Sequence, residues 1–234
     1  MNNFHTLPND SKRVIIEQTA LKQGLSKQIV EKDLWVSTIL EIVFTLPFAD
    51  KLVFKGGTSL SKVWGLIERF SEDIDLAVDR SLFGFEGDLT TKQIKKLRKA
   101  SSLFVSNEFY IELKAAITKF NLDKFVELEV QPDGEGDKTY PEPRQIFIKY
   151  QSLFEAELSY VKPQIILEIG ARSLFEPTEK ARINSIVATE FPNLQTSVVS
   201  TDITTAVAAK TFLEKAFLLH ELFTTNGCSK AERK

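Results

Sequence analysis

Two aspartates separated by a single residue are the clearest candidates for chemistry in this sequence. Asp73 and Asp75 alternate with the apolar residues Ile74, Leu76 and Val78, which is the period-two pattern of a half-buried strand. Both carboxylates are then expected on the same face of that strand. Two hard oxygen ligands at this spacing can share a divalent cation, so the pattern predicts bound Mg²⁺ or Mn²⁺.

A glycine turn precedes the two aspartates and could hold a phosphate. The apolar stretch 51–54 predicts a short strand that ends at two glycines, after which Thr58 or Ser59 opens a helix. Glycines let the backbone approach a ligand closely, and the first amides of a helix attract anions. The spacing is not that of a P-loop, which requires G-x-x-x-x-G-K-[ST]. The residues predicted to bind a nucleotide here are Lys55, Gly56, Gly57, Thr58 and Ser59.

Each half of this pattern is common by itself, because acidic residues often alternate on exposed strand faces. Together, the strand, the glycine turn, the helix and the strand with paired aspartates form a complete unit for metal-assisted transfer from a nucleoside triphosphate. In such reactions the metal orients the triphosphate and lowers the charge on the attacking and leaving oxygens. The predicted chemistry therefore needs no histidine.

A third carboxylate usually completes a site with two aspartates, and Glu168 is the candidate. It lies inside the apolar run 165–169, where an unpaired carboxylate would be costly. A metal shared with Asp73 and Asp75 would remove that cost, so all three are predicted as catalytic and metal-binding residues. The alternatives are that Glu168 pairs with Arg172 or faces solvent on an open sheet.

Glu127 and Glu129 are weaker candidates for the third acid. They alternate with Val126, Leu128 and Val130, and this is the pattern of an ordinary polar sheet face.

Lys215 is a further candidate, for catalysis and for contact with the triphosphate. It shares a helical stripe with Leu218, Leu219 and Leu222, so its side chain must either extend to solvent or point into a cleft. The spacing leaves both possibilities open. The other cations that could meet the phosphates are Lys55, Arg69 and Lys210.

The elements that position these residues follow from hydrophobic periodicity and from cap and turn residues. Helices are predicted at 11–24, from Ser26 to about 44, from 58 to about 67, at 91–120 and at 201–223. Strands are predicted at 51–54, 73–78, 125–131, 145–150 and 164–170, with a loop at 132–143. This order predicts an α+β fold. We divide it into an N-terminal helical segment (1–48), a core (49–185) and a C-terminal helical lobe (186–234).

Composition excludes several classes of protein. The 30 basic and 32 acidic residues nearly cancel, so any nucleic-acid contact must use a local patch, such as the basic helix face of Lys92, Lys95, Lys96, Arg98 and Lys99. The single cysteine and two histidines exclude a disulfide framework and disfavour a zinc site. Without a signal-like N-terminus or a run of roughly 20 apolar residues, the expected location is the cytoplasm, away from membranes.

Four segments together resemble the AbiEii/AbiGii toxin family of nucleotidyltransferases. Residues 55–60 (KGGTSL) and 69–76 (RFSEDIDL) look like its signature. Residues 31–36 (EKDLWV) resemble the helix that precedes the signature, and 211–215 (TFLEK) resemble a C-terminal lysine motif. The similarity spans roughly residues 26–223.

The resemblance implies a nucleotidyltransferase-like core, a mixed β-sheet with flanking helices, that carries a metal on the two aspartates and on a third acid. It implies that Gly57 and Ser59 contact phosphate and that Lys215 is the motif lysine. Members of the family include toxins of toxin-antitoxin or phage-defence pairs, and some add nucleotides to the acceptor end of tRNA. An RNA or tRNA acceptor and a cognate antitoxin protein are therefore expected partners.

One departure concerns the C-terminal region. The family usually continues past the motif lysine into a segment of the type R-x-x-x-D-L, whereas this sequence reaches Lys234 without it. We therefore expect either a natural polypeptide that is longer or an active site that lacks a piece.

The leading hypothesis is transfer of a nucleoside monophosphate from an NTP to an acceptor hydroxyl, with RNA as the favoured acceptor. The same chemistry on a small molecule or on a protein side chain is the first alternative. The second alternative is a nucleotide-binding module that keeps the fold and has lost turnover.

Overall fold

The computed structural model describes residues 4–67, 73–154, 161–194 and 200–231. Arg69, one of the predicted phosphate-binding residues, lies outside these ranges. Seven strands form one mixed sheet in the order β3-β4-β5-β2-β1-β7-β6. Their bounds are β1 Leu52–Lys55, β2 Asp73–Val78, β3 Val126–Val130, β4 Arg144–Tyr150, β5 Gln164–Gly170, β6 Thr178–Asn184 and β7 Ser200–Ala206.

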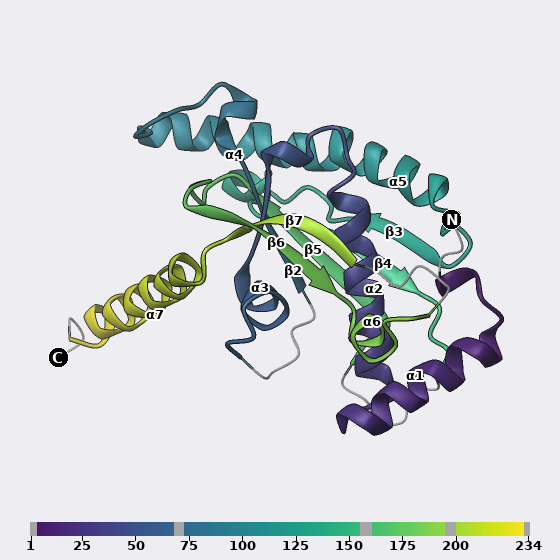
Figure 1. Cartoon of the computed structure of the whole chain (residues 1–234). Coiled ribbons are helices and arrows are strands. Elements are labelled where there is room, and N and C mark those ends of the chain that lie inside the picture. The colour runs from purple at the N-terminus through teal and green to yellow at the C-terminus, as the bar shows by residue number, and fades with distance from the viewer. Residues whose placement is uncertain (1–3, 68–72, 155–160, 195–199, 232–234) are drawn as a thin grey trace.

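The sheet is parallel in two places and antiparallel elsewhere. β2 runs parallel to β5, and β1 runs parallel to β7. The pairs β1–β2, β3–β4, β4–β5 and β6–β7 are antiparallel. β2, which carries both aspartates, therefore lies near the middle of the sheet between β1 and β5 (Figure 1).

Seven α-helices accompany the sheet in the part of the chain that the structure describes. Their bounds are α1 Asn9–Gln23, α2 Lys27–Val43, α3 Gly56–Lys62, α4 Thr91–Phe104, α5 Tyr110–Lys119, α6 Ile186–Glu190 and α7 Ala208–Ala231. A π-helical turn, Val105–Phe109, joins α4 to α5 without a break in the predicted helix 91–120. The caps are those the sequence predicts: Gly24 ends α1 in a left-handed conformation, and the side chain of Ser26 accepts a hydrogen bond from the amide of Ile29.

One face of the sheet, the core face, packs against helices. Its residues on the central strands are Ile74, Leu76 and Val78 of β2 and Leu167 of β5, all buried. They form one cluster with apolar residues of α2, α4 and α5. Because alternate residues point to opposite faces, Asp73, Asp75 and Glu168 lie on the other face, which we call the site face. Burial of the core face thus presents the carboxylates on the side away from these helices.

Two predicted elements differ from the structure. The predicted helix 201–223 is wrong over residues 201–206, which form β7, hydrogen-bonded between β1 and β6. Ser200–Ala206 is rich in threonine and contains a buried isoleucine, and a β-branched segment of this kind suits a strand. β6 was not predicted, because its sequence TEKARIN has only one buried apolar residue besides a half-buried alanine.

The helix after the glycine turn is shorter than predicted. α3 ends at Lys62, so Val63 and Trp64 lie in the turn that follows. The indole N–H of Trp64 donates to the carbonyl oxygen of Ala206, 3.2 Å away, at the end of β7. The apolar spacing that predicted a longer helix therefore reflects, at Trp64, contact with the C-terminal end of β7.

α7 leaves the sheet and projects from the body of the molecule (Figure 1). The sequence predicts that this helix is apolar on nearly every side, yet Phe212 and Phe217 are 67% and 65% exposed. Only its first turns pack on the body, where Thr211 is buried and α7 contacts α3. No described helix is both long enough and apolar enough to span a membrane.

Stability at mildly acidic pH is expected to depend on His5. This residue is buried and stacked on Trp35 at 3.8 Å between ring centroids, and its Nε2 lies 2.8 Å from the hydroxyl of Thr38. Burial, reinforced by the charge of Lys12, lowers the pKa of His5 to about 3. The unfolded chain binds a proton at His5 near pH 6.5 while the folded chain does not, so stability falls as pH drops below that value.

We therefore expect the chain to lose about 2 kcal/mol of unfolding free energy between pH 7.5 and pH 5 through His5 alone. His5→Phe keeps the aromatic contact and removes the titration. In urea unfolding, the variant should lose less stability over this pH range than the wild type. If the unfolding free energies of the two proteins fall by the same amount between pH 7.5 and pH 5, His5 is not the group responsible.

Candidate active site

Strand register brings the predicted carboxylates together. Asp75 lies directly opposite Glu168 of β5 on one side and opposite Lys55 of β1 on the other. Asp73 is two residues earlier on the same face of β2. Three carboxylates and one lysine from three neighbouring strands therefore share a small area of the site face. The sequence placed Glu168 here only by its burial pattern, and the sheet places it beside Asp75.

Asp75 is electrostatically strained by this grouping. Its pKa is raised to about 6, first by burial and then by the negative charges of Glu168 and Asp73. Lys55 and Lys215 act in the opposite direction but do not cancel the effect. A positive charge placed among these groups would remove the repulsion, so the site favours a cation.

Glu168 does not pair with Arg172, one of the alternatives left open by the sequence. Its Oε1 accepts a hydrogen bond of 2.5 Å from the side-chain amide of Gln145 on β4. Gln145 lies opposite Glu168 in the register and fixes the orientation of that carboxylate. Sequence reasoning missed Gln145, because a single glutamine at the start of a strand carries no signal until the pairing of β4 with β5 is known.

The glycine turn lies against Asp75. Gly56 has φ +79°, and a side chain there would overlap the Asp75 carboxylate and lie 2.8 Å from its Cβ. The backbone at position 56 therefore lies so close to Asp75 that no side chain fits between them. Two local hydrogen bonds shape the turn: the hydroxyl of Thr58 donates to the carbonyl of Asp73, and that of Ser59 donates to the carbonyl of Gly56 at 2.8 Å.

The lysines predicted to meet the phosphates have different partners in the structure. Lys55 forms an ion pair of 3.2 Å with Glu214 at the start of α7, and Ser173 donates to the same carboxylate at 2.5 Å. Burial alone would raise the pKa of Glu214, but the hydrogen bond from Ser173 and the charges of Lys55 and Lys210 lower it. Glu214 is therefore ionised and ties α7 to β1.

Lys210 and Lys215 extend from the same helix to different surroundings. Lys210 donates to the carbonyl oxygens of Leu174 and Phe175, so it holds the loop after β5. Lys215 is exposed, yet its charge acts on Asp75. Of these two, Lys215 is the one whose ammonium group can reach a ligand bound at the carboxylates.

The basic helix face lies away from the carboxylates. Leu97 of α4 is buried in the cluster that covers the core face, whereas Lys95, Lys96 and Lys99 are exposed on the same helix. α4 therefore packs on the opposite side of the sheet from Asp73 and Asp75. An RNA that touched both would have to pass around the sheet.

Comparison with known proteins decides the class. Residues 38–230 match the family described as nucleotidyl transferase AbiEii toxin of type IV toxin-antitoxin systems. This match includes the turn, the two aspartates, Glu168 and Lys215. The chain belongs to the AbiEii family. No match was found among curated proteins.

Membership in the AbiEii family agrees with the observed architecture and confirms the predicted fold class. The mixed sheet with flanking helices is an α+β nucleotidyltransferase-like fold. The family description makes the chain a toxin of the nucleotidyltransferase class and implies an antitoxin as its partner. It leaves the metal, the nucleotide and the acceptor open.

The carboxylates of this AbiEii chain fit a divalent cation of the magnesium type. Among the described residues, no group of three or more Asp, Glu, His or Cys side chains is placed so that it could hold a metal ion. Mg²⁺ usually needs only one or two carboxylates, because water and substrate phosphates complete its coordination shell. The adjacent Asp75 and Glu168, with the like-charge repulsion at Asp75, match that requirement.

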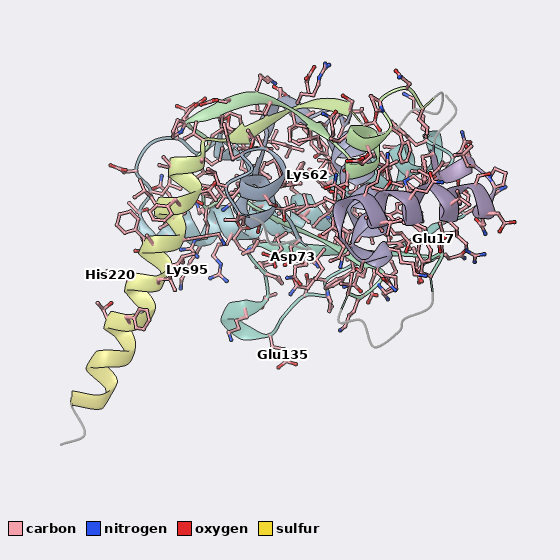
Figure 2. All side chains as sticks on the ribbon, turned by 60° about the horizontal axis from the view of Figure 1, so that its bottom comes forward. Glu17, Lys62, Asp73, Lys95, Glu135 and His220 are labelled. Carbon is pink, nitrogen blue, oxygen red and sulfur yellow. The ribbon has the colours of Figure 1, made fainter. Side chains whose placement is uncertain are left out.

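A buried ion pair anchors the turn of the AbiEii chain to the rest of the fold. The Nζ of Lys62, at the end of α3, lies 2.5 Å from the Oδ1 of Asp33 in α2, and both side chains are less than 10% exposed. The other oxygen of Asp33 accepts from the amide of Ile186 at the start of α6, at 2.7 Å. Figure 2 shows Lys62 and Asp73 in the middle of the molecule, whereas His220 lies on the projecting α7.

We expect the approach of Gly56 to Asp75 to be essential for the site. Gly56→Ala should destabilise the protein by about 1–2 kcal/mol through its positive φ and by more through overlap with the carboxylate. Gly84 is the matched control, because it has φ +73° and no atom within 4 Å of an added Cβ. Chemical denaturation should show a larger loss for Gly56→Ala than for Gly84→Ala; equal losses would contradict the close approach.

Breaking the pair of Asp33 and Lys62 should be costly because it leaves one buried charge unpaired. Lys62→Met is expected to lower the unfolding free energy by about 3–5 kcal/mol, as for other buried pairs. The exposed pair of Arg182 and Asp202 is the control, and Arg182→Met should cost at most about 1 kcal/mol. Similar unfolding midpoints for the two variants would show that the buried pair does not hold α3.

Proposed function

We propose that the chain is a divalent-metal-dependent nucleotidyltransferase that moves a nucleoside monophosphate from an NTP to an acceptor hydroxyl, with RNA, and tRNA in particular, as the acceptor. The observation that carries the proposal is the convergence of Asp73, Asp75 and Glu168 beside the backbone of Gly56. Carboxylates beside a glycine turn can bring a cation and a triphosphate together, and the match to a family of nucleotidyltransferase toxins supports this assignment.

Each residue of the site has its own role in the proposed reaction. A bound Mg²⁺ or Mn²⁺ would supply charge neutralisation of the triphosphate and orientation of its α-phosphate. Asp75 and Glu168 would hold it, with Asp73 beside them, and the hydrogen bond from Gln145 to Oε1 of Glu168 restrains that carboxylate. The turn at Gly56 and Gly57 offers backbone to the phosphates without a side chain in the way.

Lys215 supplies further positive charge to the phosphates, and Lys55, which is paired with Glu214, holds α7 beside the site. Lys55 is half-buried next to Asp75, and Lys215 approaches from α7. During transfer the acceptor oxygen forms a bond to the α-phosphorus and the bond to pyrophosphate breaks. The hydroxyl proton leaves to a carboxylate of the site or to water. Such a reaction depends mainly on alignment and on electrostatic stabilisation, which these groups provide.

The acceptor is proposed from the family, together with the chemistry of the site. Nucleotide transfer needs a hydroxyl held in line with the α-phosphate, and an RNA end provides one. Localisation in the cytoplasm, where NTPs and tRNA occur, belongs to the same proposal, as does an antitoxin that opposes the activity.

Transfer should require Asp75. With an α-labelled NTP, total cellular RNA and Mg²⁺, Asp75→Asn is expected to reduce labelling of RNA by at least about a hundredfold, because a neutral amide holds a divalent cation far more weakly than a carboxylate does. Asp202→Asn is the control, since Asp202 is an exposed carboxylate on β7 paired with Arg182. It should keep the wild-type rate.

The same assay tests the acceptor and the metal. A chelator should abolish labelling, and added Mg²⁺ or Mn²⁺ should restore it. If the label appears on protein or on a small molecule in whole extract and the RNA stays unlabelled, the acceptor is not RNA. If the Asp75→Asn variant keeps full activity, the carboxylates do not take part in the reaction.

A further inference from the structure

The site face continues beyond the carboxylates over β5, β4 and β3. The register sets its residues in rows that run across the strands. One row contains Asp75, Glu168 and Gln145. The next contains Asp73, Ile166 of β5, Phe147 of β4 and Glu129 of β3. Two apolar side chains therefore lie side by side directly next to Asp73.

Phe147 and Ile166 are exceptions on this face. The solvent-facing side of a sheet normally carries polar residues, and the neighbours Glu127, Glu129 and Lys149 are exposed as expected. Phe147 and Ile166 are only half-buried, and neither joins the hydrophobic clusters that the described residues form. They form a small, partly exposed apolar patch that the register places next to Asp73.

The charges around the patch favour an uncharged ligand over an anionic one. Lys149, the neighbour of Phe147 on this face of β4, is paired with Glu129 at 2.7 Å, so its charge is already neutralised. Glu127 and Glu129 leave the surroundings slightly acidic. A phosphate group would be repelled here, whereas an uncharged flat ring would bury Phe147 and Ile166 without losing any ion pair.

We propose that Phe147 and Ile166 form the stacking platform for a nucleobase of the acceptor, and that this contact places the acceptor hydroxyl at Asp73 and Asp75. The inference rests on the proposed function and specifies how the acceptor is held. Base stacking on an aromatic side chain is tolerant of sequence, so the platform recognises an unpaired end and not a particular base.

The spacing across the strands supports this arrangement. Neighbouring strands lie about 5 Å apart, so Ile166 is about 5 Å and Phe147 about 10 Å from Asp73 in the plane of the sheet. A terminal nucleotide whose base covers this pair can place its ribose on the side of β2. The hydroxyl then points toward the carboxylates while the phosphates of the acceptor stay away from Glu127 and Glu129.

The test separates the acceptor from the nucleotide. KM is measured for a single-stranded RNA acceptor and for the NTP with the wild type and with Phe147→Ala, Phe147→Leu and Phe147→Trp. Phe147→Ala and Phe147→Leu should raise the KM for RNA about tenfold or more and leave the KM for NTP unchanged. Phe147→Trp should keep the wild-type KM for RNA, because an indole ring also stacks on a base.

Ile111→Ala is the control for loss of an apolar side chain. Ile111 is exposed on α5 and lies in a helix that packs on the core face. This variant should keep both KM values. Thermal unfolding of all variants shows whether any change in KM follows a loss of structure.

Three results would overturn the inference. Equal KM values for RNA in the wild type and Phe147→Ala would remove the platform while the proposed function stands. A rise in the KM for NTP would assign Phe147 to the incoming nucleotide. If the wild type labels protein or a small molecule and no RNA, the proposed acceptor fails, and a nucleobase platform for it fails with it.

Discussion

The contact between the backbone of Gly56 and the carboxylate of Asp75 is the constraint on which the rest of the site depends. It can exist only because position 56 has no side chain and adopts a positive φ. The contact fixes the turn against a carboxylate that is already crowded by Glu168 and Asp73. The fold therefore brings three carboxylates and the glycine turn together, and a cation bound among them would relieve the repulsion that helps to raise the pKa of Asp75.

The two faces of the sheet separate stability from chemistry. On the core face, β2 and β5 contribute Ile74, Leu76 and Leu167 to a large buried cluster with three helices. On the site face the alternate residues are carboxylates and a half-buried apolar pair. Because a slip of one residue would exchange the two faces, the apolar core sets the register of β2, and thereby the position of the aspartates. Packing energy gained on one side thus determines the geometry on the other.

Polar contacts outside the carboxylate group connect distant segments to the site. Asp33 and Lys62 tie the helix after the turn to α2, and Glu214 ties the start of α7 to Lys55. These buried or half-buried pairs specify one arrangement of the elements more than they add stability. They also explain why two segments that resemble the AbiEii family, 31–36 and 211–215, are far from the aspartates in sequence and yet contact the elements around them.

The sequence by itself determined the local part of this protein: the alternation at 73–78, the glycine turn, the helices at 91–120, and the candidate acids including Glu168. These features depend on periodicity and on backbone freedom, which are local properties. Only the tertiary structure decided that 201–206 is a strand between β1 and β6, that Gln145 holds Glu168, that α4 lies behind the carboxylates, and that Phe147 lies beside Ile166. Each of these depends on which strands are neighbours, and strand pairing is a long-range choice that no single segment encodes.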